Sequence, residues 1–365
     1  MDWIRGDSIG YGSSSTVDLA IFRGTHFAPP SVMAVKSCGA GDSDLLNNEK
    51  QVLDQIGNSP YIIRCLGDDR SFEKGQSLHN LFLEYASGGS LADHVKKSGG
   101  RLPESTVRSY TKSILKGLDQ IHGKGFVHCD VKLQNLLVFG DGGIKIGDFG
   151  LAKKTGEAEE KQGRREKKVE IRGTPLFMAP ESVNENVYEP PCDIWALGCA
   201  VVEMLTGKPA WNYKPGTNIF SFLMRIGAGD ESPAIPDESS VELKNFLSNC
   251  FVKDPAARWT AAMLLEHPFL SADKIGNGDE TRNDAVCCSG DEFPSVSPRC
   301  PFDFPEWVSP SVQSSPARSE FESNPFDSFS SCSTASPVER IRQLAGGERQ
   351  GMLSWGDSES WLVVR

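Results

Sequence analysis

The segment at residues 126–137 constrains this chain most, because its polar residues occur at regular positions among apolar ones. Asp130, Lys132 and Asn135 alternate with hydrophobic residues, which predicts a loop that leads into a short strand. Asp148 begins the tripeptide Asp-Phe-Gly thirteen residues after Asn135. A carboxylate and an amide from adjacent turns are the oxygen ligands that Mg²⁺ prefers beside phosphate groups, and a further aspartate near a lysine can accept a hydroxyl proton. The pattern therefore predicts a site for phosphate and metal.

A glycine-containing turn between two strand-like stretches is a second candidate phosphate site. Glycine lets the backbone approach a phosphate closely and present its N–H groups. No Gly-Lys-Ser/Thr follows, so the turn is not a Walker A loop. The candidate binding residues of the turn are Ile9, Gly10, Tyr11, Gly12, Ser13, Ser14, Ser15, Thr16 and Val17.

Lys36 follows Met33, Ala34 and Val35 in an apolar stretch, where its amine loses part of its hydration unless it meets an anion. Glu49, on the next predicted helix, is a candidate partner, and Glu73 and Glu84 are rivals. The alternative is an edge lysine whose amine extends to water.

The predicted elements favour an α+β fold with two lobes. Strand-like segments are expected at residues 16–22, 32–37 and 79–86, and helices at residues 44–56, 103–122, 191–206 and 239–251. Residues 3–86 would form a small β-rich N-lobe, and residues 87–270 a larger helical C-lobe that begins near Gly88-Gly89. A cleft between two lobes is a usual place for a cofactor.

Composition changes near residue 271, after which the chain is rich in Ser and Pro. This tail, residues 271–365, holds 15 acidic and 8 basic residues, a net charge of −7 out of −11 for the whole chain. Such a segment buries too little apolar surface to offset its chain entropy, so we expect it to be mostly disordered and to act in regulation or docking.

Charge and hydropathy also argue against several classes of protein. A net charge of −11 disfavours nucleic-acid binding, and no run approaches 18 apolar residues, so we expect no membrane span. The start of the chain lacks the pattern of a secretory signal. Ten cysteines without a C-x-x-C pair indicate reduced thiols, and we expect a cytoplasmic or nuclear protein, or one found in both.

The ordered motifs together resemble those of eukaryotic protein kinases over residues 3–270. They are G-Y-G-S-S-S-T-V, M-A-V-K, Glu49, H-C-D-V-K-L-Q-N, D-F-G and Ala179-Pro180-Glu181. Asp193–Gly198 resembles a further helical motif of the family, and Arg258 the arginine that pairs with Glu181. The resemblance implies the two-lobed kinase fold, with ATP and Mg²⁺ as cofactors.

The same resemblance implies a role for each matching residue. Asp130 would orient the substrate hydroxyl and Lys132 would steady the transferred phosphate, while Asn135 and Asp148 would hold Mg²⁺. Lys36, braced by Glu49, would hold the α- and β-phosphates. The residues implied around the adenine are Val17, Ala34 and Leu137 on its two faces, the backbone of Glu84 and Ala86, and Leu83 as gatekeeper. Ordinary core packing is the alternative for Val17, Ala34 and Leu137.

Lys132 after Asp130 is typical of serine/threonine kinases. Residues 172–181 and 83–91 resemble the MEKK-type mitogen-activated protein (MAP) kinase kinase kinases, above all the compact plant members with an N-terminal kinase domain and a short acidic tail. This implies phosphorylation of activation-loop Ser/Thr in MAP kinase kinases during stress or hormone signalling. Two alternatives stay open, namely a Ser/Thr kinase with a substrate outside the cascade and a nucleotide-binding scaffold of the cascade.

Two residues depart from the family pattern. Ser15 replaces the third loop glycine, and Cys129 replaces the arginine that receives a phosphorylated activation loop. Between Asp148 and Glu181 the hydroxyl residues are Thr155 and Thr174, and Thr174 sits where the family uses an unmodified threonine. We therefore expect activity that does not depend on phosphorylation of this loop.

Outside the catalytic motifs, two segments suggest partners. The mixed-charge run at residues 157–168 is either a solvated surface or a docking site for an acidic partner. In the tail, Ser297, Ser309, Ser315 and Ser336 each precede proline and are candidate sites for a downstream MAP kinase, although Ser-Pro is also common in disordered chains. The apolar stretches at residues 301–308 and 361–364 are candidate partner-binding motifs or strands that pack back on the two lobes.

Overall fold

The structure is a computed structural model, and it describes residues 3–12, 15–22, 31–156, 171–213, 216 and 218–271. Its strands are β1 Trp3–Tyr11, β2 Thr16–Phe22, β3 Ser31–Gly39, β4 Cys65–Glu73, β5 Gln76–Glu84, β6 Phe126–Val127, β7 Leu136–Val138, β8 Ile144–Ile146 and β9 Lys153–Lys154. Its helices are α1 Asp44–Ile56, α2 Leu91–Lys97, α3 Glu104–Gly123, α4 Pro180–Glu185, α5 Pro190–Thr206, α6 Ile219–Ala228, α7 Val241–Cys250, α8 Ala261–Leu265 and α9 Pro268–Ser271.

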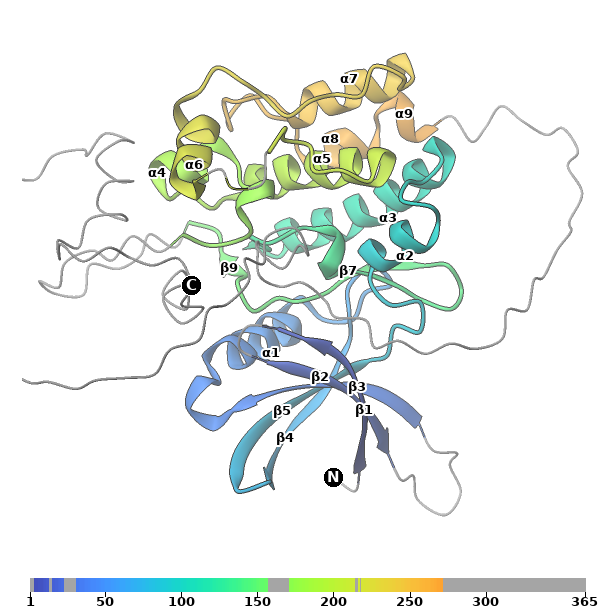
Figure 1. Cartoon of the computed structure of the whole chain (residues 1–365), viewed down its shortest axis with the longest axis vertical. Helices are drawn as coiled ribbons and strands as arrows, with labels where there is room; N and C mark the ends of the chain where they lie inside the picture. Colours follow the sequence, from blue (N-terminus) through green and yellow to red (C-terminus); the bar gives the residue numbers. More distant parts are fainter. Residues whose placement is uncertain are drawn as a thin grey trace, which may run out of the picture.

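The N-terminal part is a five-stranded antiparallel sheet with one helix, α1, beside it (Figure 1). The strand order is β1-β2-β3-β5-β4, so the hairpin-connected strands lie next to one another except where α1 separates β3 from β4. The buried positions of α1 recur every three or four residues and include Leu46, Glu49, Val52 and Ile56. This spacing packs one side of the helix inward and carries a carboxylate, Glu49, into the interior.

A polar network fastens the strands together through Arg5. The Arg5 guanidinium donates to Asp18 at 2.7 Å, to Asn80 at 2.9 Å and to Glu73 at 2.9 Å, and so joins β1 to β2, β5 and β4. It also donates to Ser37 at 3.0 Å. Consecutive residues of a strand face opposite sides of the sheet, so this network lies on the side away from Lys36.

The C-terminal part is helical and surrounds α5 (Figure 1). Helix α5 begins at Pro190-Pro191, where the missing N–H groups cost nothing, and most of its residues are buried. Trp195 and Trp211 lie at the centre of the aromatic packing, at 0 % and 2 % exposed. Gly207 ends the helix at φ +68°. A β-carbon at this position would clash with the carbonyl oxygen of Gly100, so only glycine fits.

The predicted two-lobed α+β architecture is confirmed, with differences in the elements. The strand predicted at residues 79–86 spans Gln76–Glu84, the strand-like stretch expected before the glycine-containing turn is β1, and β4 was not predicted. Strand β4 carries Asp68, Asp69 and Arg70, which mask the alternation of a strand, and it forms because it pairs along its whole length with β5. The predicted disordered tail lies outside the described residues apart from Ser271.

Within the described ranges, the helices are too short or too polar to span a membrane.

Candidate active site

Lys36 lies between two carboxylates that come from different parts of the fold. Its Nζ is 2.5 Å from Glu49 Oε2 on α1 and 2.7 Å from Asp148 Oδ1, which follows β8. Lys36 and Glu49 are 5 % and 0 % exposed. A buried amine needs such partners, because an unpaired charge in this position would be strongly destabilising. Of the three candidate carboxylates for Lys36, the structure brings Glu49 into contact.

The two rival carboxylates have other partners. Glu73 binds Arg5, whose guanidinium holds the pKa of the Glu73 carboxyl below its usual value. Glu84 accepts two hydrogen bonds from Lys145 Nζ, at 2.6 and 2.7 Å, and one from Arg64 N at 2.8 Å. The Glu84 carboxylate thus joins the end of β5 to β8 and does not reach Lys36.

The segment after Asp148 is held against α1. Phe149 is fully buried, with its ring 4.8 Å from the His128 ring, and its N–H donates to Glu49 Oε1 at 3.2 Å. Asn48 Nδ2 donates to the carbonyl oxygens of Gly150 at 2.9 Å and Ala152 at 2.8 Å. Sequence reasoning did not find Asn48, because an exposed-looking asparagine beside Glu49 gives no signal until the segment is seen to lie along α1.

Asp130 is at the centre of a hydrogen-bonded group in the loop before β7. Lys132 Nζ lies 2.8 Å from Asp130 Oδ2, and Asn135 Nδ2 donates to the same oxygen at 3.0 Å and to the Asp130 carbonyl at 2.8 Å. Thr174 Oγ1 donates to Asp130 Oδ1 at 2.7 Å and accepts from Lys132 Nζ at 2.8 Å. The three predicted catalytic residues are therefore together, and Thr174 joins them across 44 residues of chain.

Asp193 on α5 binds the backbone of this loop just before Asp130. Its carboxylate accepts from His128 N at 2.8 Å, from Cys129 N at 2.9 Å and from His122 Nε2 at 2.9 Å. Burial would raise the pKa of Asp193, but the hydrogen bond and charge of His122 and the nearby His128 hold it below its usual value. A charged Asp193 lets Cys129 keep its left-handed backbone, at φ +67°.

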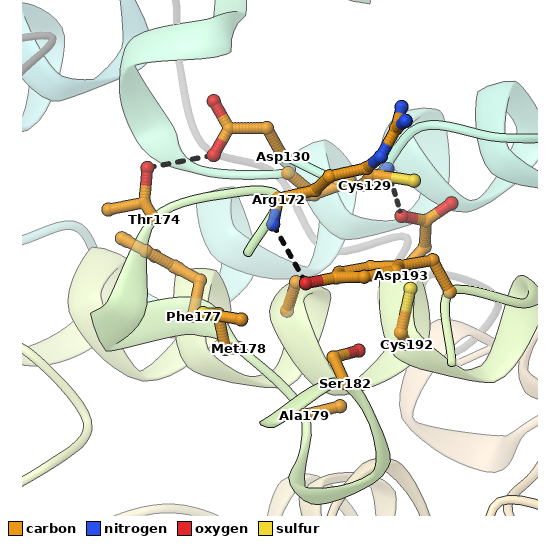
Figure 2. Close-up of a pocket in the computed structure, with 13 residues that line it drawn as sticks. Cys129, Asp130, Arg172, Thr174, Phe177, Met178, Ala179, Ser182, Cys192 and Asp193 are labelled. Carbon is orange, nitrogen blue, oxygen red and sulfur yellow. Dashed lines mark hydrogen bonds between the residues drawn. The ribbon is translucent and has the colours of Figure 1, made fainter. Parts of the chain in front are cut away.

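Cys129 lines a small cavity between α5 and the loop at residues 128–135 (Figure 2). The lining residues are Cys129, Asp130, Val131, Arg172, Thr174, Phe177, Met178, Ala179, Ser182, Tyr188, Cys192, Asp193 and Ala196. Gly173 passes close to it at φ +96°, where a β-carbon would come 2.5 Å from the Cys129 carbonyl oxygen. The Arg172 N–H donates to Tyr188 Oη at 2.7 Å, shown dashed in Figure 2. At residue 172 the chain is thus held near Cys129 by a hydrogen bond between two neutral groups, a backbone N–H and a tyrosine hydroxyl.

The glycine-containing turn joins β1 to β2, with Gly10 paired to Val17 and Tyr11 to Thr16. Gly12 N donates to Ser15 O at 2.7 Å and closes the turn. Ser15 is buried, whereas Tyr11 is 48 % exposed. The predicted residues Ser13 and Ser14 lie outside the described ranges.

The residues predicted around the adenine come from four strands, β2, β3, β5 and β7, and from the segment after β5. Ala34 on β3 pairs with Leu83 on β5, and both are buried. Ile9, Val17 and Leu137 pack against the same core while remaining partly exposed. Glu84 ends β5, and the Ala86 carbonyl accepts from Gly89 N at 3.1 Å. These positions agree with either an adenine pocket or core packing.

The donors present fit a nucleotide and a hard metal ion. Lys36 supplies an ammonium group, and Asp148 supplies carboxylate oxygens beside it. The Asn135 amide is oriented by both hydrogen bonds of its nitrogen, which leaves its oxygen as a candidate ligand. This oxygen set suits divalent cations that bind together with phosphate.

Glu181 on α4, the helix before α5, forms a buried ion pair with Arg258. Arg258 Nη1 and Nη2 lie 2.6 and 3.0 Å from the two carboxylate oxygens of Glu181. Arg258 also donates to the carbonyls of Val252 and Pro191, at 2.8 Å each, and its guanidinium lies 5.1 Å from the Trp195 ring centroid. The pair fastens α4 to the C-terminal helices.

Comparison with known proteins agrees with this geometry. Residues 3–270 match the protein kinase domain family, so the chain belongs to the protein kinases. It is 49 % identical over 367 residues to mitogen-activated protein kinase kinase kinase 20 of Arabidopsis thaliana, an alignment that covers 100 % of both chains. It is 40 % identical to mitogen-activated protein kinase kinase kinase 17 of the same plant, over 74 % of this chain and 70 % of the relative. Within its family, the chain is a serine/threonine kinase of the MAP kinase kinase kinase type.

Proposed function

We propose that this chain transfers the γ-phosphate of ATP, with Mg²⁺ as the metal, to activation-loop Ser or Thr of MAP kinase kinases. The observation that carries the proposal is the simultaneous assembly of two groups. Lys36 contacts both Glu49 and Asp148, and Asp130 contacts both Lys132 and Thr174. A catalyst of phosphoryl transfer works mainly by positioning and by electrostatic stabilisation, which requires both groups in place at once.

In this proposal Asp130 Oδ accepts the proton of the substrate hydroxyl, and Lys132 steadies the charge on the transferred group. Thr174 keeps the Asp130 carboxylate in its orientation through the 2.7 Å bond to Oδ1. Lys36 binds the α- and β-phosphates, and Glu49 keeps its amine in position. Mg²⁺ supplies positive charge against the phosphates, and Asp148 and Asn135 are the residues that would hold it.

The nucleotide would be held by residues of both lobes. We propose that the turn at residues 9–17 covers the phosphates and that the backbone of Glu84 and Ala86 meets the adenine edge. Ala34, Val17 and Leu137 would contact its faces, with Leu83 behind them. Partial exposure of Val17 and Leu137 supports this, since side chains used only for core packing would be buried.

Substrate and regulation beyond the site are also proposals. The names of the relatives above support MAP kinase kinases as substrates. Two further proposals rest on the sequence alone. One is that a downstream MAP kinase phosphorylates the Ser-Pro sites of the tail, which lies outside the described ranges from residue 272 to residue 365. The other is a cytoplasmic or nuclear location.

The experiment for the substrate uses a panel of MAP kinase kinases, each with a matched variant whose activation-loop Ser and Thr are alanine. The chain and Mg-ATP should label at least one wild-type panel member and none of the alanine variants. Labelling of an unrelated protein instead would favour a kinase outside the cascade. Binding of panel members without transfer would favour a scaffold.

A further inference from the structure

Two consecutive asparagines on α1 have different surroundings. Asn47 is exposed, and its Nδ2 donates within its own helix, to Ser43 Oγ at 3.2 Å. Asn48 is half-buried and points to the segment after Asp148. Its Nδ2 donates to Gly150 O at 2.9 Å and Ala152 O at 2.8 Å, with Phe149 O at 3.4 Å. The second asparagine therefore links two parts of the fold that are about a hundred residues apart in the chain.

The segment that Asn48 binds needs an external support. Asp148 has φ +62°, a left-handed conformation that is uncommon for a residue other than glycine. Gly150 lies so near α1 that a β-carbon would be 3.5 Å from Leu45 Cβ and 3.6 Å from Leu45 O. Carbonyl groups pressed against a helix need hydrogen-bond donors from that helix, because water has little access there.

Asn48 and Glu49 bind this segment in complementary ways. Glu49 Oε1 accepts the Phe149 N–H at 3.2 Å, and its other oxygen is taken by Lys36. Asn48 supplies the donors that the carbonyls need. An amide nitrogen carries two hydrogens, which suits neighbouring carbonyls, whereas a carboxylate at this position would face them with no hydrogen to donate.

We propose that Asn48 is a positioning residue that holds Asp148 and the Lys36–Glu49 pair in register by fastening α1 to residues 149–152. This inference rests on the proposed function. Asn48 touches neither nucleotide nor substrate and acts through Asp148. Because Asp148 is the proposed metal ligand, loss of Asn48 should raise the Mg²⁺ concentration needed for half-maximal rate.

The test uses the full chain with Asn48→Ala, Asn48→Asp and the matched control Asn47→Ala. Alanine is a better helix former than asparagine, which offsets part of the loss of hydrogen bonds in Asn48→Ala, so both alanine variants should still fold. Phosphate transfer is measured across a Mg²⁺ titration. Asn48→Ala should lower kcat/KM by about tenfold, the factor that one net hydrogen bond represents, with a higher Mg²⁺ midpoint. Asn48→Asp should lose more, and Asn47→Ala should stay within about twofold of the wild type, since it removes only an exposed contact.

A second readout does not depend on transfer. Amide hydrogen exchange of residues 149–152 should be faster in Asn48→Ala than in the wild type or Asn47→Ala. Unchanged exchange, or an Asn48→Ala rate and Mg²⁺ midpoint equal to those of Asn47→Ala, would overturn the inference. An inactive wild type would instead contradict the proposed function, and the exchange comparison would still decide whether Asn48 fastens this segment.

Discussion

Cys129 shows how one residue shapes the regulation we expect. Its backbone N–H binds Asp193 and its carbonyl lies against Gly173, while its side chain is a buried thiol. A thiol cannot form the charge-assisted contact that an arginine makes with a phosphorylated loop. The nearby contacts of Arg172 N with Tyr188 and of Thr174 with Asp130 are made by uncharged donors on this segment and do not involve the Cys129 side chain.

Thr155→Ala tests this expectation directly. Thr155 Oγ1 donates to Gly125 O at 3.3 Å, a weak contact outside the catalytic groups. The variant should keep the specific activity of the wild type to within about twofold, because no phosphate at this position is needed and removal of one weak hydrogen bond has a small effect. Steady-state transfer by protein made in bacteria is the measurement, and a near-total loss of activity would show that the threonine is required.

Glu203 gives a prediction for stability against pH. Its Oε2 is inaccessible to water and without a hydrogen bond among the described residues, and burial raises the pKa of its carboxyl from 4.5 to about 7. A raised pKa on folding means that the contribution to stability is complete below pH 4.5 and is lost as pH rises through 7. The Glu203→Gln variant has no such titration.

Chemical denaturation of both proteins at pH 5 and pH 8 checks this. The free energy of unfolding of Glu203→Gln, relative to wild type, should rise between these values by an amount on the order of 1 kcal/mol. An equal difference at both pH values would mean that Glu203 is ionised in the folded protein throughout.

Among the elements, the long helices were predicted well from the sequence, whereas the edge strand β4 was not predicted. Helix α1 was predicted at its observed bounds, because its apolar residues repeat at helical spacing. Strand β4 carries charged residues at consecutive positions, hence on both sides, and depends on pairing with β5, which local sequence does not show.

The candidate site could be predicted where motif residues carry the chemistry themselves. Lys36, Asp130 and Asn135 were found in this way. Asn48, Tyr188 and the Arg5 network were not, because they act on backbone groups or on partners distant in the chain, and only the folded arrangement brings these together.

The hydrogen bond between Arg172 N and the Tyr188 hydroxyl, just before α5, yields a prediction for Tyr188→Phe. Tyr188 is 3 % exposed, and its hydroxyl accepts the Arg172 N–H. Loss of this bond, worth about 1 kcal/mol, should loosen residues 172–174 and lower kcat several-fold, with little change in KM for ATP. Steady-state kinetics with varied ATP is the measurement.

The matched control is Tyr110→Phe, because the Tyr110 hydroxyl on α3 lies 3.4 Å from His94 Nε2 on α2 and makes no contact with residues 172–174 that the structure records. This control should behave like the wild type. If Tyr188→Phe does so too, the segment is held by other contacts.

At the scale of the whole molecule, the lobes are joined by contacts at the active site and behind it. Lys36 and Glu49 reach Asp148 and Phe149, and Lys145 of β8 binds Glu84. Behind them, Ile63 N donates to Ile146 O and Ile146 N to Tyr61 O, at 2.8 Å each. Assembly of the site and contact between the lobes are thus parts of one arrangement.

Arg258 forms a buried ion pair with Glu181 in the helical part. Arg258→Leu would leave the Glu181 carboxylate buried without its partner, and such changes cost about 3–5 kcal/mol. Arg225→Leu is the control, since Arg225 pairs at 2.8 Å with Glu231, which is 58 % exposed, and should cost about 1 kcal/mol or less. Denaturant unfolding of both variants compares them, and equal losses would contradict a special role for the buried pair.

We expect this chain to catalyse phosphate transfer with its site already assembled. The most direct test is transfer from radiolabelled Mg-ATP to a MAP kinase kinase by the chain made in bacteria, beside Asp130→Asn. We predict labelling of the substrate by the wild type and a fall of at least about a hundredfold in Asp130→Asn, in line with loss of a general base. Equal labelling by both proteins, or none by either while the substrate is bound, would contradict this expectation.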